Sequence, residues 1–208
     1  LCLIPGGVIA DRFGRVKTIV GGMILFSASS LMLVFVRDLL QFTTARAIEG
    51  IGAALVTPAV FALTADLAPT EKRGRGMGFT STMETVANLA GPTAGGLVAQ
   101  TAGFTFPFYA AFLMALVSGV LVVPIKDQTA PSPSSESSFA IFTSLRRNIS
   151  ESRSLMVLCF RGFIVGITQG LFALVFVLYM AFNVGMGPAE VGFAFTLISG
   201  STLAFTYL

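Results

Sequence analysis

The feature that most constrains this chain is a series of long apolar segments with short charged segments between them. Such segments occupy residues 1–10, 18–36, 40–67, 76–100, 104–125, 155–182 and 189–208. A helix needs about 20 mainly apolar residues to cross the hydrocarbon core of a bilayer. Only 11% of this chain is charged, against about 25% in soluble domains. We therefore expect an all-α fold, a polytopic membrane helix bundle.

One long segment, residues 126–152, does not fit this pattern. It is rich in proline and serine, a composition that neither packs as a core nor spans a membrane. We interpret it as a linker between an N-terminal half, residues 1–125, and the start of a C-terminal half, residues 153–208.

The positions of lysine and arginine predict the orientation, because these residues are enriched in cytoplasmic loops. Among the lysines and arginines, the loops on one side of the membrane carry only Arg37. The loops on the opposite side carry Arg12, Arg15, Lys17, Lys72, Arg73, Arg75, Lys126, Arg146, Arg147 and Arg153. We expect a multi-pass protein of the cell (plasma or inner) membrane, with the charged loops and the 126–152 linker on the cytoplasmic side.

The first charged segment, residues 7–17, reads GVIADRFGRVK. Its pattern Gly-x-x-Ala-Asp-Arg-x-Gly-Arg resembles the cytoplasmic loop between the second and third helices of major facilitator superfamily transporters. The resemblance implies a charge relay of Asp11, Arg12 and Arg15 with Asp66, at the cytoplasmic end of the fourth helix, that holds the two halves together on that side. The alternative is anchoring of the arginines to lipid headgroups, with Asp11 as a helix cap.

A second charged pair, Arg46 and Glu49, lies inside an apolar segment. The two residues stand three positions apart, so they share a helix face and can pair. Either one alone against lipid would cost at least ~2.5 kcal/mol, so they face a neighbouring helix or a wet cavity. The stretch 46–54 resembles the family's fourth-helix motif, which more often has glutamine where this chain has Glu49. The pair is either structural or a participant in proton coupling.

The stretch 87–99 carries small residues and a proline. Small residues recur at every fourth position, at Ala87, Gly91, Gly95 and Ala99, and such a ridge lets another backbone approach closely. Pro92 lacks an amide hydrogen and bends its helix. With Gly96, the form Gly-Pro-x-x-Gly-Gly resembles the fifth-helix antiporter motif of drug and proton exchangers. The alternative is ordinary small-residue packing.

Three polar residues at membrane depth complete the candidate site. Glu84 has no neutralising partner on its own helix, so we expect it to be buried and to take part in proton coupling with Arg46 and Glu49; a structural acid is the alternative. We expect Asn88 and Gln169 to line a substrate cavity.

The resemblance extends from the end of helix two to helix eight, about seven of twelve helices, so we expect a partial major facilitator fold. Residues 1–125 then hold the end of helix two to helix six, and residues 153–208 hold helices seven and eight. The chain begins without methionine and ends inside an apolar segment, and we expect it to be a fragment of a longer transporter.

The resemblance implies proton-coupled efflux of small hydrophobic or cationic compounds by alternating access, with protons, the substrate and the bilayer as partners. The alternatives are a nutrient or metabolite uniporter or symporter of the same superfamily, or a truncated remnant without function. The chain has no histidine, which excludes histidine metal ligands and histidine bases. We expect a monomer that is not an enzyme, with no cofactor, no metal and no nucleic-acid partner.

Overall fold

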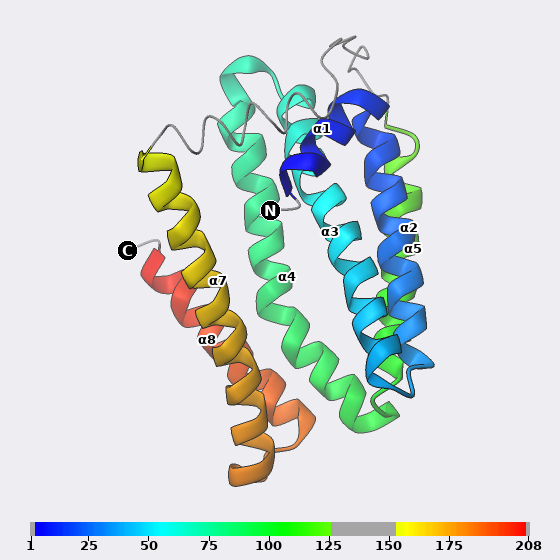
Figure 1. Ribbon diagram of the computed structural model, residues 1–208, viewed down its shortest axis with the longest axis vertical. Helices are drawn as coiled ribbons and strands as arrows, with labels where there is room; N and C mark the ends of the chain where they lie inside the picture. Colours follow the sequence, from blue (N-terminus) through cyan, green and yellow to red (C-terminus); the bar gives the residue numbers. More distant parts are fainter. Residues whose placement is uncertain (1–2, 126–152, 207–208) are drawn as a thin grey trace.

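The computed structural model describes residues 3–125 and 153–206, in which all regular structure is helical (Figure 1). The predicted all-α fold is confirmed, and the predicted linker, residues 126–152, lies outside the described residues. The helices are α1 (Leu3–Phe13), α2 (Arg15–Val34), α3 (Leu39–Leu67), α4 (Arg73–Ala102), α5 (Phe106–Val122), α7 (Arg153–Tyr179) and α8 (Pro188–Thr206), with a 3-10 turn (Thr70–Lys72) before α4 and a π turn (Met180–Val184) after α7.

The first charged segment is more helical than predicted. Helix α1 continues through Asp11 and Arg12 as far as Phe13, and α2 begins at Arg15, so the turn is the single residue Gly14. Gly14 has a φ of 95° and a ψ of 141°, a conformation that is readily available only to glycine. Charged side chains at the ends of helices reach water without ending the helix. The end of α1 and the start of α2 could therefore not be predicted from charge alone.

Helix α2 is the centre of the N-terminal half and packs on both α3 and α5. Gly22 and Gly52 let α2 and α3 approach closely: a methyl group on Gly22 would lie 2.9 Å from the Gly52 carbonyl oxygen. Two buried serines add hydrogen bonds between helices. Ser29 donates to the carbonyl of Ala45 in α3 at 2.8 Å, and Ser27 donates to a carbonyl of α5 at 2.9 Å.

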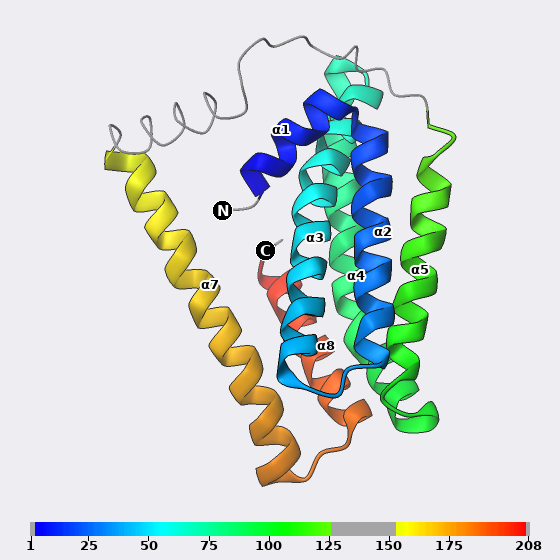
Figure 2. The same ribbon diagram turned by 45° about the vertical axis from the view of Figure 1, so that its right-hand side comes forward.

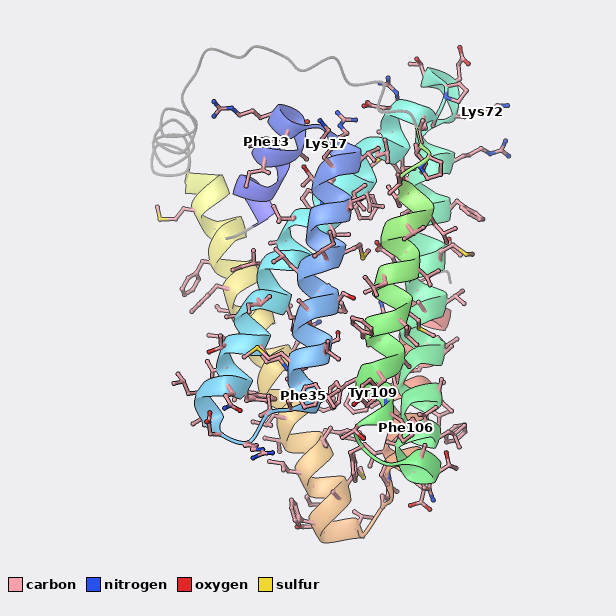
Figure 3. All side chains as sticks on the ribbon, turned by 90° about the vertical axis from the view of Figure 1, so that its right-hand side faces the viewer. Phe13, Lys17, Phe35, Lys72, Phe106 and Tyr109 are labelled. Atoms are coloured by element: carbon pink, nitrogen blue, oxygen red, sulfur yellow. The ribbon has the colours of Figure 1, made fainter. Side chains whose placement is uncertain are left out.

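The two ends of the helix bundle differ in charge. Figure 3 shows Lys17 and Lys72 at one end, which we call the basic end, and Phe35 and Phe106 at the other, which we call the opposite end. The α2–α3 turn, the α4–α5 turn and the turn between α7 and α8 lie at the opposite end (Figure 1). All long helices therefore run between the two ends.

The C-terminal half meets the N-terminal half through one helix pair. Helix α8 packs along α4, whereas α7 diverges from α2–α5 toward the basic end (Figure 2). Phe176 of α7 contacts Phe195 of α8, with their ring centroids 5.2 Å apart. The contact between the halves thus consists mainly of α4 against α8.

The surface of the bundle suits a bilayer. Three described helical segments are long and apolar enough to cross a membrane: Arg15–Val34, Leu39–Leu67 and Phe160–Val184. Large apolar side chains remain widely exposed, among them Phe182 at 81% and Leu39 at 79%. In water such a surface would be strongly unfavourable, but lipid chains solvate it.

Candidate functional site

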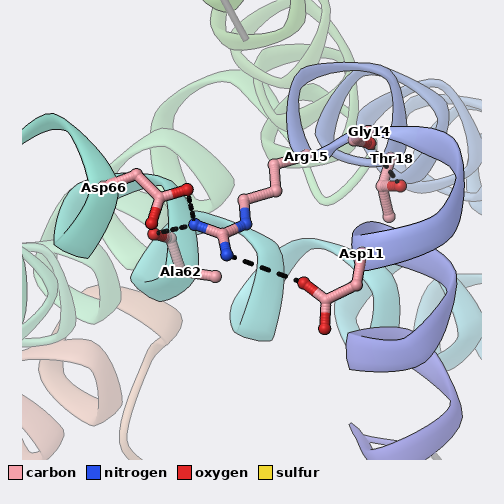
Figure 4. Close-up of polar contacts among 6 residues, drawn as sticks. All are labelled: Asp11, Gly14, Arg15, Thr18, Ala62 and Asp66. Carbon is pink, nitrogen blue, oxygen red and sulfur yellow. Dashed lines mark hydrogen bonds and ion pairs between the residues drawn. The ribbon is translucent and has the colours of Figure 1, made fainter. Parts of the chain in front are cut away.

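Three residues of the predicted charge relay lie together at the basic end (Figure 4). The guanidinium of Arg15 forms an ion pair with the carboxylate of Asp66 and donates to the carbonyl of Ala62 at 2.5 Å. Its other terminal nitrogen lies 3.6 Å from the carboxylate of Asp11. Arg12, the fourth predicted member, is exposed near the end of α1.

The local fold explains why Arg15 reaches this position. Gly14 turns the chain, so Arg15 starts α2 while its side chain extends over the last turns of α3 (Figure 4). The carbonyl end of a helix carries partial negative charge, which favours a cation there. The Arg15 side chain is 15% exposed and that of Asp66 is 30% exposed, whereas Asp11 is 65% exposed. The Arg15–Asp66 pair is therefore the shielded part of the cluster.

Arg46 and Glu49 form the predicted pair on α3. Arg46 donates to the Glu49 carboxylate at 2.7 Å, and its guanidinium lies 5.4 Å from the centre of the Phe42 ring, within the range of a cation–π interaction. The Arg46 side chain is 48% exposed and that of Glu49 is 25% exposed. Among the described residues, no third charged side chain is recorded in contact with this pair.

Glu84 is exposed on α4, so the prediction that it is buried is wrong for the described residues. It lies one turn beyond Thr80, whose hydroxyl oxygen is 3.3 Å from that of Thr64 in α3. Among the described residues no hydrogen bond or ion pair joins Glu84 to Arg46 or Glu49. Asn88 on α4 and Gln169 on α7 are also exposed.

The antiporter-like segment of α4 packs directly on α8. A methyl group on Gly96 would lie 2.4 Å from the carbonyl oxygen of Pro188, and one on Gly192 would lie 2.2 Å from the carbonyl oxygen of Pro92. Backbone therefore touches backbone at both glycines. Cα–H groups in such contacts also make weak hydrogen bonds to carbonyl oxygens.

The predicted ridge of Ala87, Gly91, Gly95 and Ala99 is not the face that α8 contacts. Nothing lies within 4 Å of a methyl group placed on Gly91 or Gly95. The contact instead uses Pro92 and Gly96, each of which follows a ridge residue by one position and therefore lies about 100° further around the helix axis. The prediction that this ridge meets another backbone is therefore wrong for the described residues, because the close contact of α4 lies on the neighbouring face of the helix.

Two threonines join the halves in the middle of this contact. The hydroxyl oxygens of Thr93 and Thr196 lie 2.6 Å apart, and Thr196 donates to the carbonyl of Leu89 at 2.7 Å. The α8 side of the contact was not predicted from the sequence. A signal was present, because Pro188, Gly192, Thr196 and Gly200 recur at every fourth position, the small-residue spacing that favours close helix packing.

Beside this contact lies an apolar crevice of about 480 Å³ at the opposite end. Its walls come from both halves: Pro92, Gly95, Gly96 and Ala99 of α4, Phe104, Pro107 and Phe108 in and before α5, Val177 of α7, Ala181 of the π turn, and Met186, Pro188, Val191, Gly192 and Phe195 in and before α8. Asn88 and Gln169 do not line it. No charged side chain of the described residues lines the crevice.

The family model described as Major Facilitator Superfamily matches residues 1–208, the whole chain. The chain belongs to the major facilitator superfamily. Members of this superfamily are integral membrane transporters, so the helical bundle, its apolar surface and the paired halves have a common explanation.

Two relatives from this superfamily are named for drug resistance. The chain is 35% identical over 119 residues to multidrug resistance protein 2 of Bacillus subtilis, covering 57% of this chain and 30% of that protein. It is 26% identical over 197 residues to the quinolone resistance protein NorA of Staphylococcus aureus, covering 92% of this chain and 48% of that protein. The chain thus spans less than half the length of these curated relatives.

A solved structure supports the fold. The crystal structure of the peptide transporter POT in complex with alafosfalin superposes with a TM-score of 0.58 at 18% identity, covering 85% of this chain and 37% of that chain. At this identity the likeness establishes the major facilitator fold alone.

Proposed function

We propose that this major facilitator protein exports small hydrophobic or cationic compounds in exchange for protons, by alternating access of its two halves. The drug-resistance relatives support export. The antiporter-like form of the α4 segment supports exchange over symport. A nutrient or metabolite transporter is the competing function.

The observation that carries the proposal is the backbone contact between α4 and α8 at Gly96 and Gly192. It joins the halves through the same segment that resembles the antiporter motif, and toward the basic end α7 diverges (Figure 2). Such a shape suits a transporter closed at one end and accessible from the other. Packed interfaces of this kind have discrete arrangements, which alternating access requires.

We propose that the charge relay of Asp11, Arg12, Arg15 and Asp66 acts in the other state of the cycle, in which the halves are closed at the basic end. There it stabilises the closed contact between the halves. Arg15 already forms an ion pair with Asp66 and a hydrogen bond to the end of α3. Its guanidinium is therefore pre-positioned and loses little conformational entropy when the C-terminal half packs against it.

Proton coupling is assigned to Arg46, Glu49 and Glu84. Glu84 is the carboxylate in the middle of α4, and because its side chain is exposed, it is accessible to protons and to a cationic substrate. Arg46 and Glu49 already form an ion pair with each other. They therefore act by exchanging this ion pair for other partners and not by exposing their charges to bulk water. Asn88 lies one turn beyond Glu84 and, with Gln169, supplies hydrogen bonds to the substrate.

The orientation follows from charge. We place the basic end in the cytoplasm of a cell membrane and the opposite end outside, because lysine and arginine are retained on the cytoplasmic side. In this orientation the α4–α8 contact closes the outer side. We propose that the transporter acts as a monomer.

The test is transport by the intact protein in proteoliposomes. With a vesicle lumen more acidic than the medium, protons that leave should drive ethidium, a permanent lipophilic cation, into the lumen against its own gradient. A protonophore should stop the accumulation. Equilibration of ethidium that ignores the protonophore would support a uniporter, and no ethidium flux under either condition would remove export of cations from the proposal.

A further inference from the structure

The hydrogen bonds of Thr93 and Thr196 have a definite direction. A threonine hydroxyl has one hydrogen to donate, and Thr196 donates its hydrogen to the carbonyl of Leu89. The 2.6 Å contact between the two hydroxyls therefore takes its hydrogen from Thr93. The result is a chain of two hydrogen bonds, from Thr93 to Thr196 and from Thr196 to α4.

Each of the two threonine hydroxyls lies near the carbonyl that the other would use within its own helix. Threonines inside helices commonly donate to the carbonyl four residues earlier, as Thr85 does here to Ser81 at 2.8 Å. For Thr93 that carbonyl belongs to Leu89, which Thr196 occupies instead. For Thr196 that carbonyl belongs to Gly192, and the Thr93 hydroxyl lies 3.5 Å from it.

This arrangement provides two alternative sets of acceptors. While α4 and α8 are in contact, the hydroxyls bond across the contact. When the helices separate, a rotation of each side chain returns its hydroxyl to the carbonyl of its own helix. Neither state leaves a hydroxyl without a partner in the low-dielectric membrane, where a missing hydrogen bond would be strongly unfavourable.

We propose that Thr93 and Thr196 form a hydroxyl latch, which stabilises the closed contact of α4 with α8 and releases without an unsatisfied polar group. They are positioning residues that need not touch the substrate. The proposal deepens the proposed alternating access of the two halves. It lies outside the charged residues assigned to the relay and to proton coupling, so the latch responds to helix separation and not to pH.

The latch can be tested on the intact protein in lipid bilayers without substrate or proton gradient. Spin labels on cysteines at Thr101 and Val184, with every native cysteine, Cys2 and Cys159 among them, replaced by serine, report the distance between the halves at the opposite end by pulsed electron–electron double resonance. This readout does not depend on what is transported. A failure of the latch is therefore distinguishable from a failure of the proposed export.

The expected results follow from the direction of the hydrogen bonds. Thr196→Val removes both bonds with little change in shape and should lower the ratio of closed to open distances about eightfold, whereas Thr93→Val removes one and should lower it about threefold, for interhelical hydrogen bonds of ordinary membrane strength. Thr196→Ser should restore most of the closed population. Thr85→Val, which removes a hydroxyl that bonds only its own helix, is the matched control and should change nothing.

Two results would overturn the latch. One is a distance distribution for Thr196→Val that equals that of Thr85→Val. The other is a loss of the closed population in Thr196→Val that Thr196→Ser does not recover, since this would show that the residue acts through packing and not through its hydroxyl.

Discussion

Substitution of Gly192 by alanine tests how closely the halves must approach. The added methyl group would lie 2.2 Å from the carbonyl oxygen of Pro92 and 2.9 Å from the carbonyl carbon. Both atoms are backbone, so no side-chain rotation relieves the clash. Because Cβ contacts under 3.0 Å are essentially never seen, the helices must separate by about 0.8 Å or more at this point, which weakens the dispersion contacts around it.

The expected magnitude comes from overpacking. Forcing an extra carbon into a packed contact costs typically about 1–3 kcal/mol, and 2 kcal/mol is about a 30-fold change in an equilibrium. Gly192→Ala should therefore shift the protein from the contact of α4 with α8 toward separated helices by about this factor. The rate of ethidium transport should fall, because one state of the cycle becomes poorly populated.

The assay is the spin-label distance between residues 101 and 184, read together with ethidium uptake. Gly91→Ala is the matched control, since the added methyl group meets no atom within 4 Å and the substitution raises the helix propensity by the same amount. Gly96→Ala, whose methyl would lie 2.4 Å from the Pro188 carbonyl oxygen, should behave like Gly192→Ala. Equal distances and equal transport in Gly192→Ala and Gly91→Ala would refute the reasoning.

Three further predictions concern single residues elsewhere. Asp66→Asn should lower the free energy of unfolding in detergent by about 1–2 kcal/mol, because it removes the charged partner of the shielded Arg15 guanidinium. Asp11 is widely exposed, so Asp11→Asn should change the free energy of unfolding little. Equal changes in the two variants would contradict this. Gly14→Ala should destabilise by about 1–3 kcal/mol because of its positive φ, measured against Gly21→Ala, which meets nothing. Glu84→Gln should abolish gradient-driven ethidium uptake without loss of membrane insertion, and uptake at the unsubstituted rate would remove Glu84 from the coupling mechanism.

Where local signals were strong, the sequence predicted the fold well. Helix α3 was expected over residues 40–67 and spans Leu39–Leu67, because Asp38 caps its first turn by accepting from the Gln41 amide at 2.7 Å and apolar residues follow. The first charged segment was less well predicted. A run of charges resembles a loop in composition, but only Gly14 departs from helical geometry there.

The candidate site shows what sequence spacing cannot supply. The pairing of Arg46 with Glu49 follows from their separation within one helix, and the structure contains it. The partner of α4 could not be read in the same way, because the rotation of a helix depends on which neighbour covers it. The hydroxyls of Thr93 and Thr196 are meaningful only after α4 and α8 are known to touch.

The measurement that tests the proposed alternating access most directly is reversible cross-linking at the opposite end. Cysteines at Gln100 of α4 and Gly187 before α8 lie where the two chain segments face each other, since a methyl group on Gly187 would lie 4.0 Å from the Gln100 amide nitrogen. With the native cysteines replaced, a short cleavable thiol cross-linker should stop ethidium transport, and cleavage should restore it. Transport by the cross-linked protein at the rate of the uncross-linked protein would contradict opening between α4 and α8.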